Sequence, residues 1–166
     1  MERERTRSYS WQDPLAALEL ARGLPGLEVV RRMLTGELPH PPIADVLGLR
    51  LVEAEEGRAV FEGEPGEQHY NIVGTVHAGF TTTLLDSAMG CALATTLPAG
   101  VGWTTLELKA NFTRPLTVET GRVRCTGAVI HPGRRVATAE ARLEDLRGRL
   151  LAHATSTILV LASDGR

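Results

Sequence analysis

The chain has 166 residues, enough for one domain with a sizeable hydrophobic core. Its net charge of −2 argues against a nucleic-acid partner or an anionic membrane surface, and no apolar run is long enough to span a membrane. No apolar signal segment follows the charged first residues, so we expect a cytoplasmic protein whose cysteines, Cys91 and Cys125, are reduced and buried.

Residues 1–42 are predicted to form an N-terminal helical extension. The pair Asp13-Pro14 is typical of a helix start, because aspartate caps the first amides and proline is tolerated at the first helical position. This helix is expected to run to about Arg22, and the apolar spacing predicts a second helix that ends near Gly36. We expect the extension to pack on the domain or on a partner subunit rather than to take part in chemistry.

The domain itself is predicted to span residues 43–166. After one helical turn at 43–47, the alternation of apolar residues predicts a hairpin over 49–64. A loop then leads to a long helix from Phe80 to Leu97. Apolar residues cover most of the circumference of this helix, which is typical of a buried helix.

Further strands are expected after the long helix, at 105–113, 122–130, 135–144 and 149–161. Short turns between long strands predict an antiparallel meander. One buried helix with about five antiparallel strands gives an α+β fold in which the sheet curls around the helix.

The most informative segment is the loop Asn71-Ile72-Val73-Gly74-Thr75-Val76-His77-Ala78-Gly79, which leads into the long helix. Small residues at a helix start expose unpaired amides and the positive end of the helix dipole, which can hold an oxyanion. Asp86 lies two turns further along, in an apolar segment where an unpaired carboxylate is costly unless it has a function. Such a carboxylate can act as base or nucleophile, so the segment indicates hydrolysis of an acyl compound.

Three segments together resemble the hotdog-fold acyl-CoA thioesterases, in particular the PaaI-like branch. They are the loop 71–79, the helix segment Thr82-Thr83-Leu84-Leu85-Asp86-Ser87-Ala88, and the strand segment Thr104-Thr105-Leu106-Glu107-Leu108-Lys109-Ala110-Asn111-Phe112-Thr113-Arg114-Pro115. The resemblance implies a hotdog fold, with an antiparallel sheet wrapped around one long central helix. It also implies hydrolysis of acyl-CoA without a separate cofactor, by a homodimer joined edge to edge and often paired again into a homotetramer.

The resemblance also implies roles for individual residues. Asp86 would be the base or the nucleophile, while Asn71 and the backbone amide of Ala78 would donate hydrogen bonds to the thioester carbonyl. Thr105 would position the attacking water, with Thr104 as the alternative. The active site would lie between subunits, with Asn71 and Ala78 of one chain facing Asp86 and Thr105 of the other.

Four more residues have two interpretations each. His77 either caps the long helix and positions the loop, which we favour, or polarises the carbonyl. Gly79 is expected to allow close packing, and its place in the loop also makes it a candidate contact for coenzyme A. Arg134 and Arg135 flank a turn and either bind the phosphates of coenzyme A or are solvated charges.

Two other functions remain open on the same fold. One is an acyl-thioester dehydratase or hydratase, and the other is a non-catalytic acyl-CoA-binding protein. The five histidines show no metal-ligand spacing, so no metal site is expected. Aryl, short-chain and medium-chain acyl groups all remain possible substrates.

Overall fold

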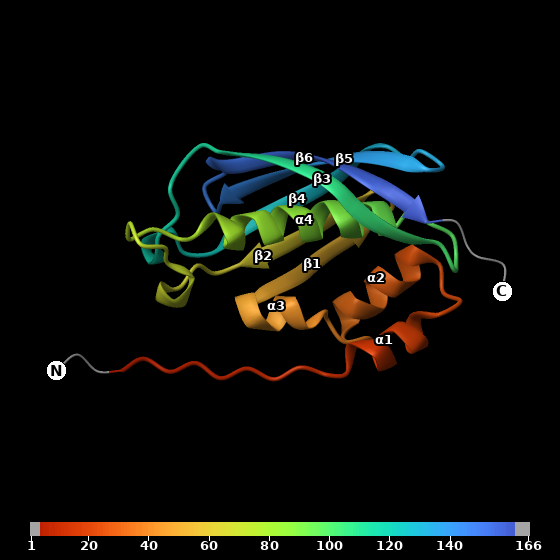
Figure 1. Ribbon diagram of the computed structural model, residues 1–166, viewed down its shortest axis with the longest axis horizontal. Helices are drawn as coiled ribbons and strands as arrows, with labels where there is room; N and C mark the ends of the chain where they lie inside the picture. Colours follow the sequence, from red (N-terminus) through yellow and green to blue (C-terminus); the bar gives the residue numbers. More distant parts are fainter. Residues whose placement is uncertain (1–3, 162–166) are drawn as a thin grey trace.

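The computed structural model describes residues 4–161, and within them a six-stranded antiparallel sheet wraps around one long helix (Figure 1). The predicted α+β architecture is therefore confirmed. In chain order the elements are α1 (Pro14–Ala21), α2 (Gly26–Thr35), α3 (Pro42–Leu47), β1 (Leu49–Glu55), β2 (Arg58–Gly63), α4 (Ala78–Ala94), β3 (Gly102–Phe112), β4 (Val123–His131), β5 (Val136–Asp145) and β6 (Leu150–Leu161).

The order of strands across the sheet is β1-β2-β4-β5-β6-β3. Strands β4, β5 and β6 form the predicted meander, but β3 pairs with β6 and not with β4. The meander prediction is wrong for β3 because a long connection, 113–122, joins β3 to β4. Such a connection does not force its two strands to be neighbours, as a tight turn does. Strand β3 consequently lies at one edge of the sheet, and β1 lies at the other.

Helix α4 forms the centre of the core. Leu84, Leu85 and Met89 have no solvent exposure, as the apolar pattern predicted. The helix approaches β4 so closely that a side chain at Gly127 would overlap the backbone of Ala88. It ends at Ala94, earlier than predicted, because hydroxyl groups of the following threonines donate to carbonyls of its last turn.

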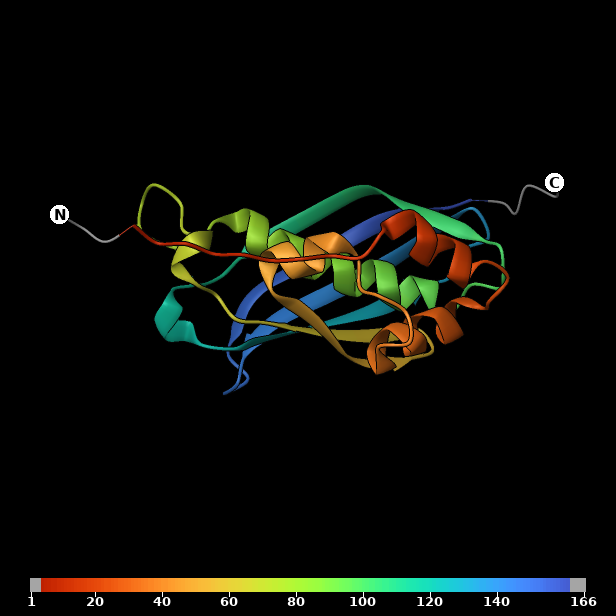
Figure 2. The same cartoon turned by 90° about the horizontal axis from the view of Figure 1, so that it is seen from below.

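The N-terminal helices cover one end of α4 and the edge strand β1 (Figure 2). Val30 of α2 is buried, and the amide of Gly26 donates to the carbonyl of Leu97 at 3.0 Å. Helix α1, in contrast, has no buried residue. The predicted boundary between extension and domain, at 42/43, falls at the first residues of α3, and residues 162–166 of the predicted domain lie outside the described part.

None of the helices within residues 4–161 combines the length and the apolar character needed to cross a lipid bilayer.

Candidate active site

Asp86 lies in the middle of α4 and pairs with a hydroxyl group from β3. Thr105 Oγ1 donates to Asp86 Oδ1 at 2.9 Å. Strand β3 has a register shift against β6 between Thr105 and Glu107. Such a bulge redirects the side chains next to it, and bulges are common beside active sites. The sequence left Thr104 and Thr105 as alternatives, and the structure gives this contact to Thr105.

A cavity of about 160 Å³ opens beside this pair. Its other lining residues are mostly apolar: Met33, Pro41, Ile43, Ala44, Phe61, Ser87, Gly90, Cys91 and Trp103. Burial, reinforced by the negative charge of Asp86, raises the pKa of the Cys91 thiol to about 12. The Cys91 thiol is therefore uncharged. Cys125 is buried, as predicted, whereas Cys91 is only half-buried because it lines this cavity. Asp86 is the one carboxylate among the described residues that line the cavity.

The N-terminal extension contributes to this cavity, which sequence reasoning missed. Met33 comes from α2, and Pro41 precedes α3. The sequence carried no signal for this role, because an apolar residue that lines a cavity has the same pattern as one that packs in the core. Trp103 was missed for the same reason.

Asn71 closes the loop before α4. Its Oδ1 accepts from the amides of Val73 and Thr75 at 2.9 and 3.2 Å, and its Nδ2 donates to Thr75 Oγ1 at 3.1 Å. The turn role that asparagine favours is thus present. The amide group has two hydrogens, and the second has no acceptor among residues 4–161, so it is available to a ligand.

His77 caps α4, as we favoured. Its Nδ1 accepts from the amide of Gly79 at 2.9 Å, and its carbonyl accepts from the amide of Phe80 at 3.1 Å. A Cβ atom at Gly79 would lie 3.0 Å from Nδ1, so glycine allows this close packing. The amide of Ala78 has no acceptor within the described part of the chain, and it lies at the positive end of the helix dipole.

The structure brings Asn71 and Ala78 together in a second cavity, of about 270 Å³. Its other lining residues are Thr75, Val76, Thr81, Phe112, Thr113, Arg114, Pro115 and Leu116. Within the described part of the chain, no residue lines both this cavity and the one beside Asp86. Ala78 and Asp86 are eight residues apart on one helix, a separation of about 12 Å. One chain therefore carries two separate halves of the predicted site.

Arg134 and Arg135 lie at the far end of α4 from Ala78. Arg134 lines a cavity of about 350 Å³ together with Leu93 and Leu97, and both arginines are exposed. The structure does not bring them beside Asn71, Ala78 or Asp86 in the same chain. A role in binding coenzyme A stays a prediction.

Metal-ligating side chains do not gather anywhere in residues 4–161: no three histidine, cysteine or acidic residues lie close enough to hold an ion.

Comparison with known proteins identifies the family. The Thioesterase superfamily model matches residues 73–152. Human acyl-coenzyme A thioesterase 13 is 30% identical over 114 residues, which cover 68% of this chain and 80% of that protein. The chain belongs to the Thioesterase superfamily. The 1,4-dihydroxy-2-naphthoyl-CoA hydrolase of Listeria monocytogenes is 26% identical over 118 residues, covering 71% of this chain and 94% of the relative.

Solved structures agree with this assignment. A variant of the phenylacetic acid degradation protein PaaI from Thermus thermophilus superposes with a TM-score of 0.65 at 32% identity, covering 72% of this chain and 98% of that one. PaaI from E. coli has a TM-score of 0.72, covering 83% and 95% of the two chains, and at 18% identity it supports the fold alone. The hotdog fold, the PaaI-like resemblance and the assignment to the thioester hydrolases are thus confirmed.

Proposed function

We propose that this protein hydrolyses acyl-CoA thioesters to a free acid and coenzyme A, with Asp86 as the reactive carboxylate. The observation that carries the proposal is the hydrogen bond from Thr105 to Asp86 at the wall of a mostly apolar cavity. A carboxylate held there can activate a water molecule or attack a carbonyl carbon. The second cavity supplies the amide of Ala78 and the side chain of Asn71 as donors for the carbonyl oxygen.

The two halves of the site would combine in a homodimer. Strand β3 is an edge strand, so the backbone groups along its outer side are free to pair. It also exposes apolar side chains, with Leu106 57% and Phe112 50% exposed. A long edge with apolar side chains favours pairing with another strand. These features support dimerisation through β3, and a second pairing into a tetramer is expected from the family resemblance.

The geometry of such a dimer supports a shared site. Two antiparallel copies of β3 bring the beginning of one strand beside the end of the other. Thr105 lies near the beginning of β3, and Phe112, at its end, lines the cavity of Asn71 and Ala78. The Asp86 cavity of one subunit would then face the Ala78 cavity of its partner.

The mechanism follows from these positions. The amide of Ala78 and the Nδ2 of Asn71 donate to the thioester carbonyl oxygen, and each donor contributes up to about 3 kcal/mol as negative charge develops there. In one route Asp86 removes a proton from a water held by Thr105, and the water oxygen adds to the carbonyl carbon. The tetrahedral intermediate then collapses, the C–S bond breaks, and the thiolate leaves and takes up the proton held by Asp86.

In the second route Asp86 itself adds to the carbonyl carbon. The C–S bond breaks to give a mixed anhydride and free coenzyme A, and water then hydrolyses the anhydride and regenerates Asp86. His77 acts in both routes as a positioning residue, since its imidazole holds the loop that presents the Ala78 amide. Detection of an acyl adduct on Asp86 by mass spectrometry after rapid quenching would favour the second route.

The decisive experiment measures thiol release from a panel of acyl-CoA thioesters with Asp86→Asn and the wild type. We expect kcat to fall about a hundredfold or more, because the amide can be neither base nor nucleophile. Asp45→Asn is the matched control, since it removes the same charge from an exposed position on α3. Wild-type turnover by a folded Asp86→Asn variant would overturn the proposal.

Binding of acyl-CoA by the wild type without any hydrolysis would instead identify a non-catalytic binding protein.

We propose Arg134 and Arg135 as contacts for the phosphates of coenzyme A, with Gly79 beside the loop that binds the thioester. A cytoplasmic location stays a prediction from the sequence.

A further inference from the structure

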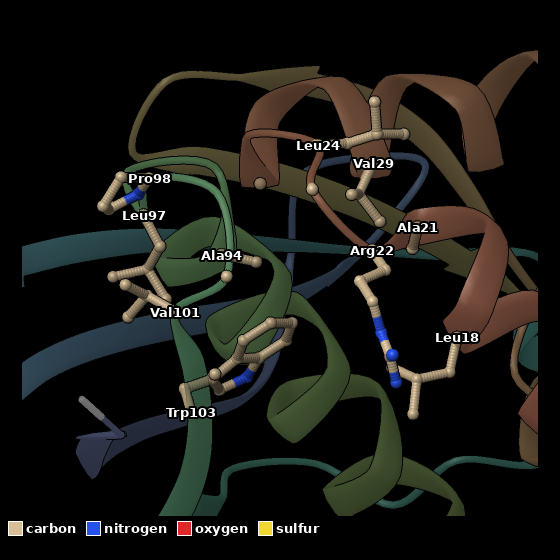
Figure 3. A pocket seen from close by; sticks show the side chains of 14 residues that line it. Leu18, Ala21, Arg22, Leu24, Val29, Ala94, Leu97, Pro98, Val101 and Trp103 are labelled. Atoms are coloured by element: carbon tan, nitrogen blue, oxygen red, sulfur yellow. The ribbon is translucent and has the colours of Figure 1, made fainter. Parts of the chain in front are cut away.

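A fourth cavity, of about 340 Å³, lies under the N-terminal helices (Figure 3). Figure 3 shows Leu97, Val101 and Trp103 on one side of it and Leu18 and Ala21 on the other. The lining residues are Leu18, Ala21, Arg22, Gly23, Leu24, Gly26, Val29, Ala94, Leu97, Pro98, Gly100, Val101, Gly102 and Trp103. Its volume is in the range of ligand pockets and much larger than the voids of a close-packed interior.

The interior of this cavity is apolar. Arg22 is the one charged residue among those that line it. Its guanidinium pairs with Glu19 at 2.7 Å, and its side chain is 72% exposed, so the charge lies at the rim. A cavity with an apolar interior gives up dispersion contacts when it is empty and regains them when it holds hydrocarbon.

The two helices that cover the cavity differ in how they are attached. Helix α2 is fixed: a side chain at Gly26 would overlap the carbonyl of Ala94, and the Gly26 amide bonds to Leu97. Helix α1 is attached more loosely, because it has no buried residue and even its leucines Leu15 and Leu18 are 70% and 63% exposed. The helix therefore covers the cavity without filling it, and apolar surface remains available to a ligand.

Trp103 connects this cavity with the Asp86 cavity. Among residues 4–161 it is the one residue that lines both. Its indole lies over α4 at Gly90, where a Cβ atom would come 3.2 Å from Nε1. Trp103 is 38% exposed, so its side chain keeps surface that a ligand can contact. An acyl chain whose carbonyl carbon lies beside Asp86 can pass along Trp103 into the cavity under α1.

We propose that the cavity between α1, α2 and the α4–β3 connection binds the hydrocarbon end of the acyl group, which makes medium-chain aliphatic acyl-CoA the preferred substrate class. The inference rests on the proposed hydrolase function. Asp86 and Ala94 are about 12 Å apart along α4. An extended chain advances about 1.2 Å per bond, so roughly ten bonds separate the carbonyl carbon from the cavity. Acyl groups of about ten to twelve carbons reach it, and butanoyl groups do not.

The test is a chain-length series, from butanoyl-CoA to dodecanoyl-CoA, measured with Ala21→Trp. The indole would fill the cavity from α1, and Ala16→Trp is the matched control on an exposed position of the same helix that does not line the cavity. Each methylene removed from water contributes about a fourfold change in binding. We therefore expect the ratio of kcat/KM for decanoyl-CoA to that for butanoyl-CoA to fall at least tenfold in Ala21→Trp and to stay unchanged in Ala16→Trp.

A second variant and a binding measurement make every outcome decisive. Val29→Phe fills the cavity from α2 and should lower the same ratio, with thermal unfolding as the check on folding. An unchanged ratio in both folded variants, with the wild type active, would overturn this inference and leave the hydrolase function standing. If the wild type hydrolyses no acyl-CoA, the proposed function fails. Calorimetry with decanoate then tests whether the cavity binds a hydrocarbon chain. Binding to Ala21→Trp that is tenfold weaker than to the wild type supports the cavity as the binding site. Equal binding to both proteins, or no binding to the wild type, overturns it.

Discussion

The hydrogen bond between Thr105 and Asp86 gives the sharpest quantitative prediction. Thr105→Val keeps the size and shape of the side chain but removes the hydroxyl that donates to Asp86 Oδ1 at 2.9 Å. A hydrogen bond to a charged group contributes about 1.5–3 kcal/mol, and exposure of Thr105 favours the lower end. Because about 1.4 kcal/mol corresponds to a factor of ten, we expect kcat to fall about tenfold to a hundredfold.

The assay is steady-state thiol release, with kcat and KM determined separately. Thr104→Val is the matched control, since the same change one residue earlier in β3 removes a hydroxyl that does not contact Asp86. Thr105→Ser restores the hydroxyl and should recover most of the activity. Wild-type kcat in Thr105→Val, or an equal loss in Thr104→Val, would refute the reasoning.

Three further predictions concern coenzyme A, the dimer and acid stability. Replacing both Arg134 and Arg135 by glutamine should raise KM for acyl-CoA several-fold with little change in kcat, because the phosphates lie far from the reacting carbonyl. Leu106→Lys should weaken the dimer and make specific activity fall on dilution, measured by gel filtration and thiol release. The hydrogen bond from the Arg149 amide, with further bonds in the same turn, holds the pKa of Asp145 below its usual value. Because the unfolded chain binds a proton at Asp145 more tightly than the folded protein does, the unfolding free energy should fall as the pH drops below about 4. In Asp145→Asn this free energy should fall less steeply with pH, since the titrating group is gone.

Each of these predictions has a control or an opposing result. Arg147→Gln removes an exposed charge from another turn and should leave KM unchanged. Leu146→Lys changes a leucine that is 72% exposed and lies outside β3, so the dimer should persist. For acid stability, the unfolding free energy is measured by urea titration at several pH values between 5 and 3. The same change of this free energy with pH in the wild type and in Asp145→Asn would contradict the role of Asp145.

The sequence alone determined the local features of this protein. The apolar circumference of α4 predicted a buried helix, and the segment 71–79 predicted a loop with free amides at the helix start. The cap by His77 and the close packing at Gly79 also followed from the sequence, because a cap depends on residues next to each other in the chain. These features depend on the repeat of apolar residues along a helix and on residues that are close in the chain, and contacts with distant segments do not change either.

The tertiary structure decided how distant segments meet. Strand β3 pairs with β6 at the edge of the sheet, although the order along the chain predicted a meander. The choice between Thr104 and Thr105 depended on a bulge that only the pairing with β6 reveals. The contributions of Met33 and Trp103 to the cavities were also invisible, because apolar residues in the core and around a ligand have the same sequence pattern. Long-range contacts depend on which apolar faces meet, and many arrangements of the same elements satisfy one local pattern.

In the proposed function, the carboxylate of Asp86 in the middle of α4 and the free amide of Ala78 at its start act on the same carbonyl. In one chain they are separated by two helical turns, and each lines its own cavity. The sequence determined both groups, since each depends on the residues of a single helix and the loop before it. Their separation within one subunit is a property of the folded chain, because the rise of the helix fixes the distance between them.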